Sequence, residues 1–256
     1  MVVAVPQAFA AEGDEADKPD ILVMIGIGPR VAPSYPGSTR AKAGAFPEIN
    51  VWRENELLPV ETPDEGKSIT LIGNRGTSAA GFSIAVAPRR GEEPATAGLG
   101  TVGFGIEAGI FAETYVLPPL RLRGEVRHGI GSHAALTGEV ALDLVLRDKD
   151  NDRRLVTFGP RARFAGAKYN RRFFGIDAAQ SAASGLDQYA PDGGLIALGL
   201  MGGAHFPLDR QWGLFGFAGY ERLQGSAADS PLTRERGSPD QFTAGLALTY
   251  IIRIDR

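Results

Sequence analysis

Few residues in this sequence could carry out covalent chemistry, and the histidines are the first to consider. His128 and His133 flank Ser132, and Glu125 is near in sequence, so the residue types of an acyl-transfer site are present. Ser132 and His133 are adjacent, however, and adjacent residues of an extended chain point to opposite faces. They are therefore poorly placed to hydrogen-bond. We expect no enzymatic activity, and a lipid hydrolase is kept as an alternative.

Metal and cofactor motifs are incomplete. Asp148, Asp150 and Asp152 alternate as in a calcium-binding loop, but the glycine at the sixth position and the closing glutamate are missing. Gly26-Ile27-Gly28 lacks the third glycine of a nucleotide-binding turn. The chain has no cysteine, which excludes disulfides and thiolate sites. We expect no metal and no cofactor.

The remaining candidate residues are charged side chains that could form ion pairs. Carboxylates such as Glu107 and Glu139 could form a glycosidase pair, but arginines alternate with them on neighbouring segments. We interpret these residues as a cross-strand charge network inside a barrel, in which Arg123 pairs with Glu107 or Glu139. Its expected members are Glu107, Glu113, Arg121, Arg123, Glu125, Arg127, Glu139, Asp143, Arg161 and Arg163. Such a network would fill the interior and leave little conductance.

Charged residues at every second position indicate β-strands, because alternate side chains of a strand point to the same face. Residues 134–147 show the pattern most clearly, with leucines on one face and Glu139 and Asp143 on the other. Eleven segments fit this pattern or a weaker form of it, and because bacterial barrels use even strand numbers we expect ten to twelve. The other segments that we delimit are 21–30, 45–53, 68–73, 81–87, 102–113, 120–130, 156–164 and 242–252.

The connections between these segments alternate between short and long. Residues 117–119, 148–152 and 207–210 are polar or proline-containing turns suited to hairpins, whereas 169–192 and 224–240 are much longer. Short turns at one rim and long loops at the other are typical of outer-membrane barrels.

Composition and strand length decide between a membrane barrel and a soluble one. The net charge of −3 gives no basic surface for nucleic acid, and no apolar run reaches the ~18–20 residues of a membrane-spanning helix. The segments are nearer the ~9–11 residues of a bilayer-crossing strand than the ~5–6 of soluble strands. A soluble sandwich or lipocalin-like barrel remains an alternative. We predict an all-β, transmembrane, antiparallel up-and-down barrel.

The same pattern predicts which residues meet lipid. Leu142 and Leu144 are expected on the lipid-facing side of segment 134–147, where an added charge should be costly. A charge at Thr137 or Ala141, on the opposite side, should be tolerated better.

The N-terminus resembles the end of a secretory signal. Residues 1–11 are mostly apolar and contain Ala8-Phe9-Ala10, a small-x-small cleavage pattern, so we expect cleavage after Ala10 or Ala11. Residues 12–20 are polar and are expected to form a mobile periplasmic terminus. Residues 21–256 then form the barrel.

Three stretches resemble the MipA/OmpV family, named for the MltA-interacting protein. They are 173–189, with Phe173-Phe174-Gly175-Ile176 and Tyr189; 227–242, with Ser230-Pro231-Leu232; and 33–38, with Tyr35-Pro36-Gly37-Ser38. The similarity spans nearly the whole chain, is strong from residue 155 onward and is weak between 54 and 98. The last aromatic, Tyr250, lies six residues from the end, which departs from the terminal aromatic usual in such barrels.

The resemblance implies a location and a role. It implies a barrel in the lipid of the Gram-negative outer membrane that acts as a scaffold for peptidoglycan (murein) metabolism. The implied partners are a lytic transglycosylase and a penicillin-binding murein synthase. Other members of the family are porin-like, so a small channel is the alternative. The family has no agreed catalytic residues to transfer to this sequence.

Overall fold

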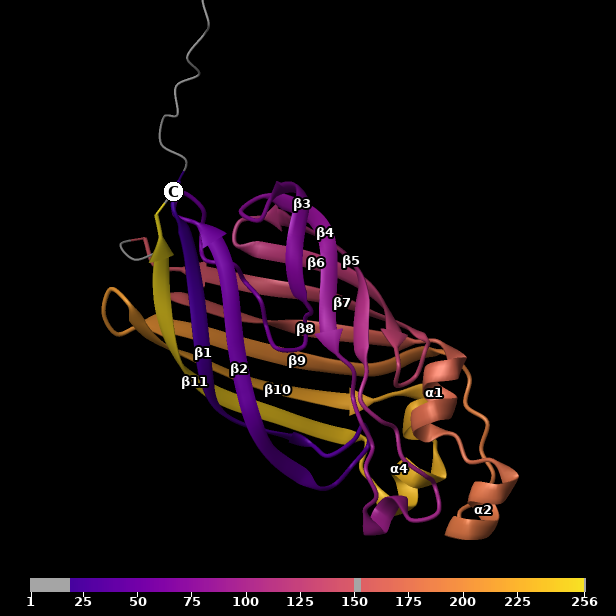
Figure 1. Cartoon of the computed structure of the whole chain (residues 1–256). Coiled ribbons are helices and arrows are strands. Elements are labelled where there is room, and N and C mark those ends of the chain that lie inside the picture. Colours follow the sequence, from indigo (N-terminus) through magenta and orange to yellow (C-terminus); the bar gives the residue numbers. More distant parts are fainter. Residues whose placement is uncertain (1–18, 150–152, 256) are drawn as a thin grey trace, which may run out of the picture.

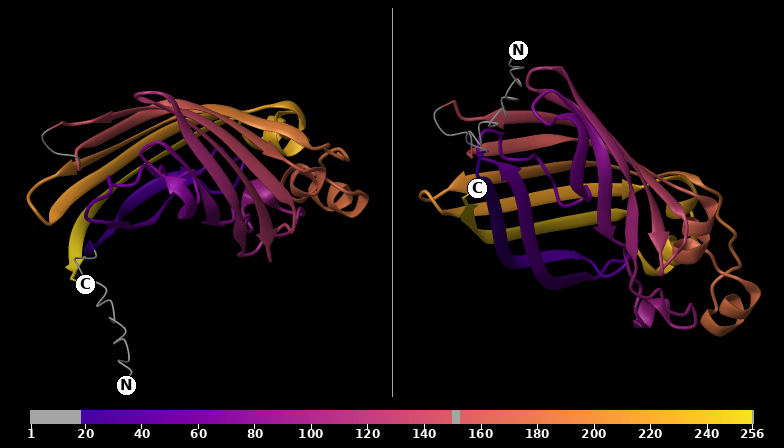
Figure 2. Two further views of the ribbon diagram at one scale, coloured as in Figure 1. Left: turned by 90° about the horizontal axis from the view of Figure 1, so that it is seen from above. Right: turned by 45° about the horizontal axis from the view of Figure 1, so that its top comes forward.

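The computed structural model describes residues 19–149 and 153–255 and contains one curled sheet (Figure 1), whose curvature is seen from above in Figure 2. The sheet has eleven strands in the order β2-β1-β11-β10-β9-β8-β7-β6-β5-β4-β3, and every pairing is antiparallel. The strands are β1 Ile21–Pro33, β2 Ala41–Arg53, β3 Lys67–Asn74, β4 Ser78–Val86, β5 Ile106–Leu117, β6 Leu120–Ile130, β7 Leu136–Arg147, β8 Leu155–Ala165, β9 Gly194–Pro207, β10 Trp212–Leu223 and β11 Asp240–Ile254. The predicted antiparallel up-and-down barrel topology is confirmed.

The two rims of the wall differ as the loop lengths predicted. The start of β1, the end of β11 and the short turns, such as that between β5 and β6, lie at one rim, which we call the terminal rim (Figure 1). The long connections lie at the other, the helical rim. They contain α1 Ala167–Phe174, α2 Ala178–Ser184, α3 Gly225–Ala228, α4 Pro231–Arg236 and the 3-10 turn Pro94–Thr96. In the described part of the chain, no helix has the length and apolarity needed to cross a membrane.

Among residues 19–149 and 153–255, the wall has one seam, between β2 and β3. β1 pairs with both β2 and β11, with Ile21 opposite Arg53 on one side and Ile254 on the other, and so joins the two ends of the chain. β2 and β3 are the two edges of the sheet. Because an even number of antiparallel pairings separates them, both edges run toward the terminal rim.

Residues 54–66 explain how an odd number of strands is possible. This connection, which we call the inner segment, returns from the terminal rim through the interior instead of through the wall (Figure 1). Pro59 and Pro63 lack the backbone N–H that a strand within a sheet must donate. Leu58, Val60 and Glu65 of the inner segment are buried.

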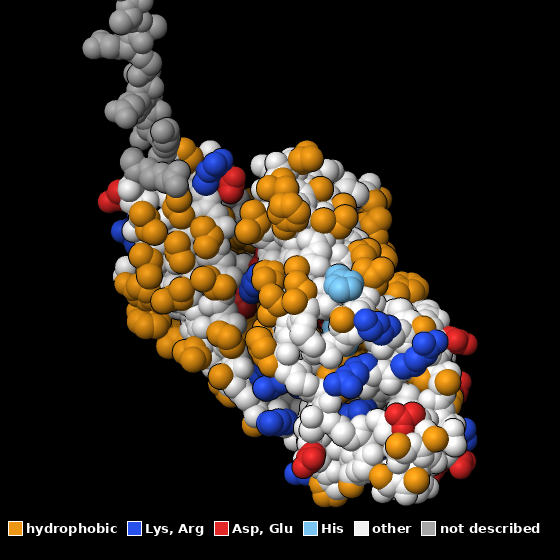
Figure 3. Space-filling model, turned by 45° about the vertical axis from the view of Figure 1, so that its right-hand side comes forward, with side chains coloured by type: hydrophobic (Ala, Val, Ile, Leu, Met, Phe, Trp, Pro, Cys, Tyr) orange, Lys and Arg blue, Asp and Glu red, His pale blue; other side chains and the backbone are white. Residues whose placement is uncertain are grey.

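The outer surface of the wall is apolar (Figure 3). On β7, Val140 and Leu144 point outward and are exposed, whereas Glu139 and Asp143 point inward and are buried. This arrangement is the reverse of a soluble sandwich, in which polar residues face outward. It is the pattern of a barrel wall that faces lipid.

Aromatic pairs stand on this outer surface near both rims. The rings of Trp212 and Tyr250 lie 4.8 Å apart toward the terminal rim, and those of Tyr220 and Phe242 lie 4.9 Å apart toward the helical rim. Amphipathic rings at these two levels fit the aromatic girdles of membrane barrels.

The helical rim carries a packed cap rather than irregular loops. Tyr169, Phe173 and Phe174 of α1 are buried against Ile196 and Leu223 of the wall. Local signals fix the helices: Asp177 and Gln180 form a capping box at the start of α2, and Gly185, at φ 77°, ends it.

Arg90 joins the 87–105 connection to α1, and its removal should loosen the cap. Its guanidinium is buried and donates to the carbonyls of Phe173 (2.8 Å), Leu99 (3.0 Å) and Gly100 (3.3 Å). Burial lowers the pKa of Arg90 to about 10. Arg90→Ala leaves these carbonyls without their partner, at ~1–3 kcal/mol for each group that stays buried. Hydrogen exchange should rise in residues 87–105 and α1 but not in β7. Exposed Arg89→Ala is the control, and equal protection in both variants would contradict this role.

Candidate functional site

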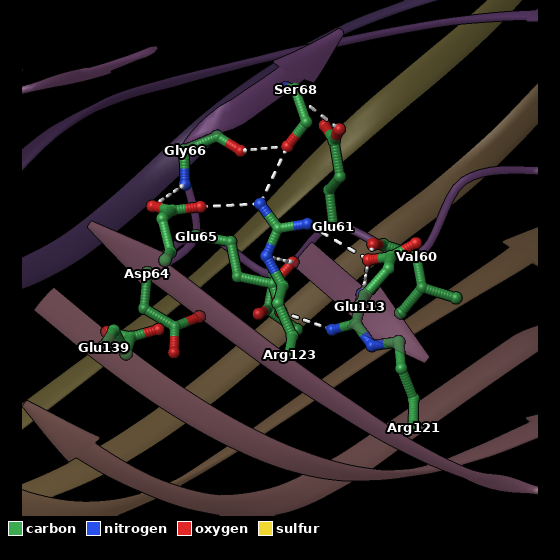
Figure 4. A network of polar contacts seen from close by, with 12 residues as sticks. Val60, Glu61, Asp64, Glu65, Gly66, Ser68, Glu113, Arg121, Arg123 and Glu139 are labelled. Atoms are coloured by element: carbon green, nitrogen blue, oxygen red, sulfur yellow. Dashed lines mark hydrogen bonds and ion pairs between the residues drawn. The ribbon is translucent and has the colours of Figure 1, made fainter. Parts of the chain in front are cut away.

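A network of ion pairs lies in the interior, and Figure 4 shows the part of it around Arg121 and Arg123 of β6. Arg121 is described first. Its Nη2 lies 2.7 Å from Oδ2 of Asp143 on β7 and also pairs with Glu65 of the inner segment. Its Nη1 lies 3.3 Å from Oε2 of Glu113 on β5 and donates to the carbonyl of Val60 at 2.8 Å. Arg121 therefore links three carboxylates and is almost completely buried, with 1% of its surface exposed.

Arg123, two residues further along β6, extends the network toward β3. Its Nη1 lies 3.0 Å from Oε2 of Glu113, and its Nη2 lies 2.6 Å from Oε2 of Glu125. Nη2 also donates to Oγ of Ser68 at 2.8 Å. The guanidinium stacks over the ring of Phe111, 4.2 Å from its centroid, a favourable cation–π arrangement.

Arg161 of β8 fixes the inner segment from the opposite side. Its Nε lies 2.6 Å from Oδ2 of Asp64, and its Nη2 donates to Oγ1 of Thr62 at 3.1 Å. Its Nη1 lies 2.8 Å from Oδ1 of Asp143, which Arg121 also contacts. Each planar guanidinium thus joins strands to the inner segment, as its fork of donors permits.

The remaining expected residues form the margins of the network. Arg127 pairs with Glu107 (2.9 Å) and with Glu125. Arg163 pairs with Glu221 of β10 at 2.6 Å. Glu139 is buried, and its ion pair among the described residues is a long one, 4.0 Å to Nε of Arg161.

The structure places the ten expected residues in the barrel interior, but one expected ion pair, that of Arg123, differs. Arg123 contacts Glu113 and Glu125, not Glu107 or Glu139 as expected. The reason is register: the short β5–β6 turn sets Arg123 opposite Glu113 on β5 and opposite Ala141 on β7.

Residues that the sequence did not reveal supply much of the rest. Asp64 and Glu65 of the inner segment pair with arginines, and so does Glu61, which lies 2.9 Å from Nη1 of Arg75. Lys67 joins Glu48 of β2 and Glu61, at 2.7 and 3.2 Å. The available signal was the acidic character of a proline-containing connection, together with an odd number of strand segments.

A small cavity adjoins the inner segment. It has a volume of about 20 Å³ and lies among Met24, Leu58, Val60, His205 and Phe215. That volume holds about one water molecule.

His128 and His133 lie in different environments. His128 lies on the exposed outer face of β6. His133 is buried, contacts Oε1 of Glu107 through Nε2 at 2.9 Å, and packs against the ring of Tyr169. The buried hydroxyl of Ser132 has no hydrogen-bond partner among the described residues. The proposed acyl-transfer grouping of histidine, Ser132 and Glu125 therefore has no hydrogen bond between its members in this part of the chain.

Some expectations concern residues outside the described ranges. The signal and N-terminal segments, 1–11 and 12–20, fall there except for residues 19 and 20, as do Asp150 and Asp152. Within residues 19–149 and 153–255, no group of three or more histidine, aspartate or glutamate residues is arranged to hold a metal.

An antiparallel wall that is apolar outside, ion-paired inside and flanked by aromatic girdles defines an outer-membrane type of β-barrel. The family model described as MltA-interacting protein MipA matches residues 25–252. The chain belongs to this family, as its sequence predicted.

Solved structures of two outer-membrane proteins are also similar. One is outer membrane protein OprG from Pseudomonas aeruginosa, at 10% identity and a TM-score of 0.32, covering 92% of this chain and 97% of that chain. The other is outer membrane protein AlkL, at 11% identity and a TM-score of 0.23, covering 98% of both. These scores are low, and the fold assignment rests on the strands themselves. No curated protein matches the chain.

Proposed function

We propose that this protein is a non-enzymatic outer-membrane scaffold for the machinery that synthesises and hydrolyses murein. The observation that supports this proposal is the occupied interior. The inner segment and three arginines, Arg121, Arg123 and Arg161, are ion-paired in the interior, where a transported solute would have to pass. A barrel filled in this way acts through its surfaces. The matching family is described by an interaction, with MltA, rather than by a reaction or a solute.

The terminal rim offers a surface of hydrogen-bonded turns for such partners. Asp209 accepts hydrogen bonds from the backbone N–H groups of Gln211 and Trp212, both at 2.7 Å, which hold the β9–β10 turn in one shape. Arg153 beside β8 donates to the carbonyls of Arg210 (2.6 Å) and Asp209 (3.2 Å) and so ties two turns together. Because outer-membrane barrels place their short turns in the periplasm, this rim would face the murein layer.

Binding measurements on the purified barrel in lipid nanodiscs test this role. We expect a lytic transglycosylase and a penicillin-binding murein synthase to bind the wild type, and both to bind less tightly to a Lys149→Glu, Arg210→Glu variant of the terminal rim. A Lys168→Glu, Arg171→Glu variant reverses the same charge on the helical rim and serves as the matched control.

Two outcomes would overturn the proposal. One is the absence of binding by the wild type, and the other is an effect confined to the helical-rim variant. The channel alternative predicts a large, steady single-channel conductance in planar bilayers, whereas a filled interior predicts a small one.

A further inference from the structure

The seam between β2 and β3 is a gap in the hydrogen bonding of the wall. Each edge strand pairs on one side only, β2 with β1 and β3 with β4. On the inner side of the gap, Nζ of Lys67 reaches Oε1 of Glu48 at 2.7 Å and Oε2 of Glu61 at 3.2 Å. In the space-filling view a hollow separates two apolar surfaces, and acidic and basic side chains are visible at its floor (Figure 3).

Lipid chains cannot fill this gap at low free energy. The edges expose backbone N–H and C=O groups, and in hydrocarbon each unpaired group costs several kcal/mol. The residues that flank the gap on the outside, Ile49 and Val51 on β2 and Ile69 and Leu71 on β3, are apolar and exposed. The gap therefore lies in the lipid-facing wall, and it needs an occupant that forms backbone hydrogen bonds.

The direction of the edges limits what that occupant can be. Both edges run toward the terminal rim, so one strand between them, antiparallel to both, runs from the terminal rim to the helical rim. The inner segment has this direction, but Pro59 and Pro63 cannot donate and Arg121 and Arg161 hold it inside. A second copy in the same membrane has its own edges parallel to these, not antiparallel.

The Lys67–Glu48 ion pair is compatible with a gap one strand wide. Neighbouring strands lie ~4.7–4.9 Å apart, so a missing strand leaves its two neighbours about 10 Å apart. A lysine and a glutamate that extend toward each other can span that distance.

We propose that the seam binds one β-strand supplied by a partner protein, which completes the wall. The strand has apolar side chains on its lipid side and polar ones toward Glu48, Asn50 and Ser68, and it matches β3 in length, at 8 residues. A partner bound at the terminal rim can provide a strand that runs toward the helical rim if it uses its C-terminal segment. The free C-terminus then lies nearest the helical rim. The inference rests on the proposed scaffold role and identifies one form that its partner takes.

A photo-crosslinking experiment with a defined peptide tests this inference. The barrel is folded in phosphatidylcholine vesicles with benzoylphenylalanine at Ile69, beside the seam, or at Val140, on the outer face of β7. The probe is a peptide of alternating valine and threonine, as long as β3, with a free C-terminus. We expect several-fold more peptide adduct at Ile69 than at Val140, and no such excess with a peptide that has proline at its centre.

A second variant examines self-closure of the wall. Ile49→Cys and Ile69→Cys place the only two cysteines of the chain on opposite sides of the seam. A bismaleimide with a spacer of about 10 Å can join cysteines across a gap one strand wide, and we expect the peptide to slow this crosslinking. Equal adduct at Ile69 and Val140, or crosslinking that is equally fast with the peptide present, would overturn the inference. If the peptide does not bind at the seam but partners still bind the terminal rim, only the strand-binding inference is rejected. If partners do not bind the terminal rim, the scaffold role is rejected.

Discussion

Replacing Arg121 with methionine is expected to destabilise the folded barrel by about 3–5 kcal/mol, the usual cost of removing one partner of a buried ion pair. The substitution keeps much of the side-chain volume but leaves Asp143, Glu113 and Glu65 without their shared cation. It also removes the donor to the carbonyl of Val60, so the inner segment should loosen with it. Urea unfolding of protein folded into lipid vesicles measures the loss.

Arg253→Met is the matched control. Arg253 also pairs with three carboxylates, Asp20 at 2.6 Å, Glu54 at 2.7 Å and Asp255 at 3.6 Å, but it lies at the exposed terminal rim. An exposed pair contributes only ~0–1 kcal/mol. Adding Asp143→Asn to Arg121→Met should recover part of the loss, because it removes one excess buried negative charge while Arg161 keeps its ion pair with Asp64. Equal losses for Arg121→Met and Arg253→Met would show that the interior is wet and that the network does not stabilise the barrel.

A charge on the lipid face should have the second largest effect. Leu142 lies in the middle of β7 with its side chain toward the outer surface, opposite Leu122 of β6. Leu142→Arg is expected to cost ~2–4 kcal/mol if the bilayer midplane lies at this level, because the guanidinium must enter hydrocarbon. Folding titrations into vesicles compare it with Leu136→Arg, on the same face near the helical rim, where the cost falls to ~0–1 kcal/mol. Similar costs at Leu136 and Leu142 would mean that β7 does not cross the bilayer.

The structure corrects the expectation for the opposite face of β7. A charge at Ala141 was expected to be tolerated because the position faces inward. Ala141 is 1% exposed and lies opposite Arg123 on one side and Arg161 on the other. A cation there meets two like charges in a closely packed interior, and we expect Ala141→Arg to be as harmful as Leu142→Arg.

Strand identity and sidedness were predictable because alternation depends only on neighbouring residues. The segment 120–130 agrees with β6, Leu120–Ile130, and 156–164 falls within β8, Leu155–Ala165. The segment 102–113 was less accurate. Alternation begins at Val102, but β5 begins at Ile106, and Val102 forms an isolated bridge with Arg90 instead.

The inner segment could not be placed from sequence because no local pattern encodes it. Its apolar and acidic residues suit a solvated loop as well as an interior, and only its partners on β6 and β8 distinguish the two. Thr62 and Arg161, for example, are 99 residues apart in the chain. The cap of α1 to α4 was expected as loops for a related reason, since its helices are short and depend on packing against the wall.

The position of the inner segment also constrains the order in which the barrel assembles. Strands β3 to β11 form a meander in which each strand pairs with the next along the chain, so their contacts close comparatively small loops. The β1–β2 hairpin joins this meander only through β1 and β11, where Ile21 meets Ile254, and this pairing has a far larger loop-closure entropy. We therefore expect the arginines of β6 and β8 to be positioned before the β1–β2 hairpin pairs with β11. The inner segment, which connects this hairpin to β3, then enters the interior together with the hairpin. Slow, late closure at β1–β11 would then be the kinetic step at which the interior becomes filled.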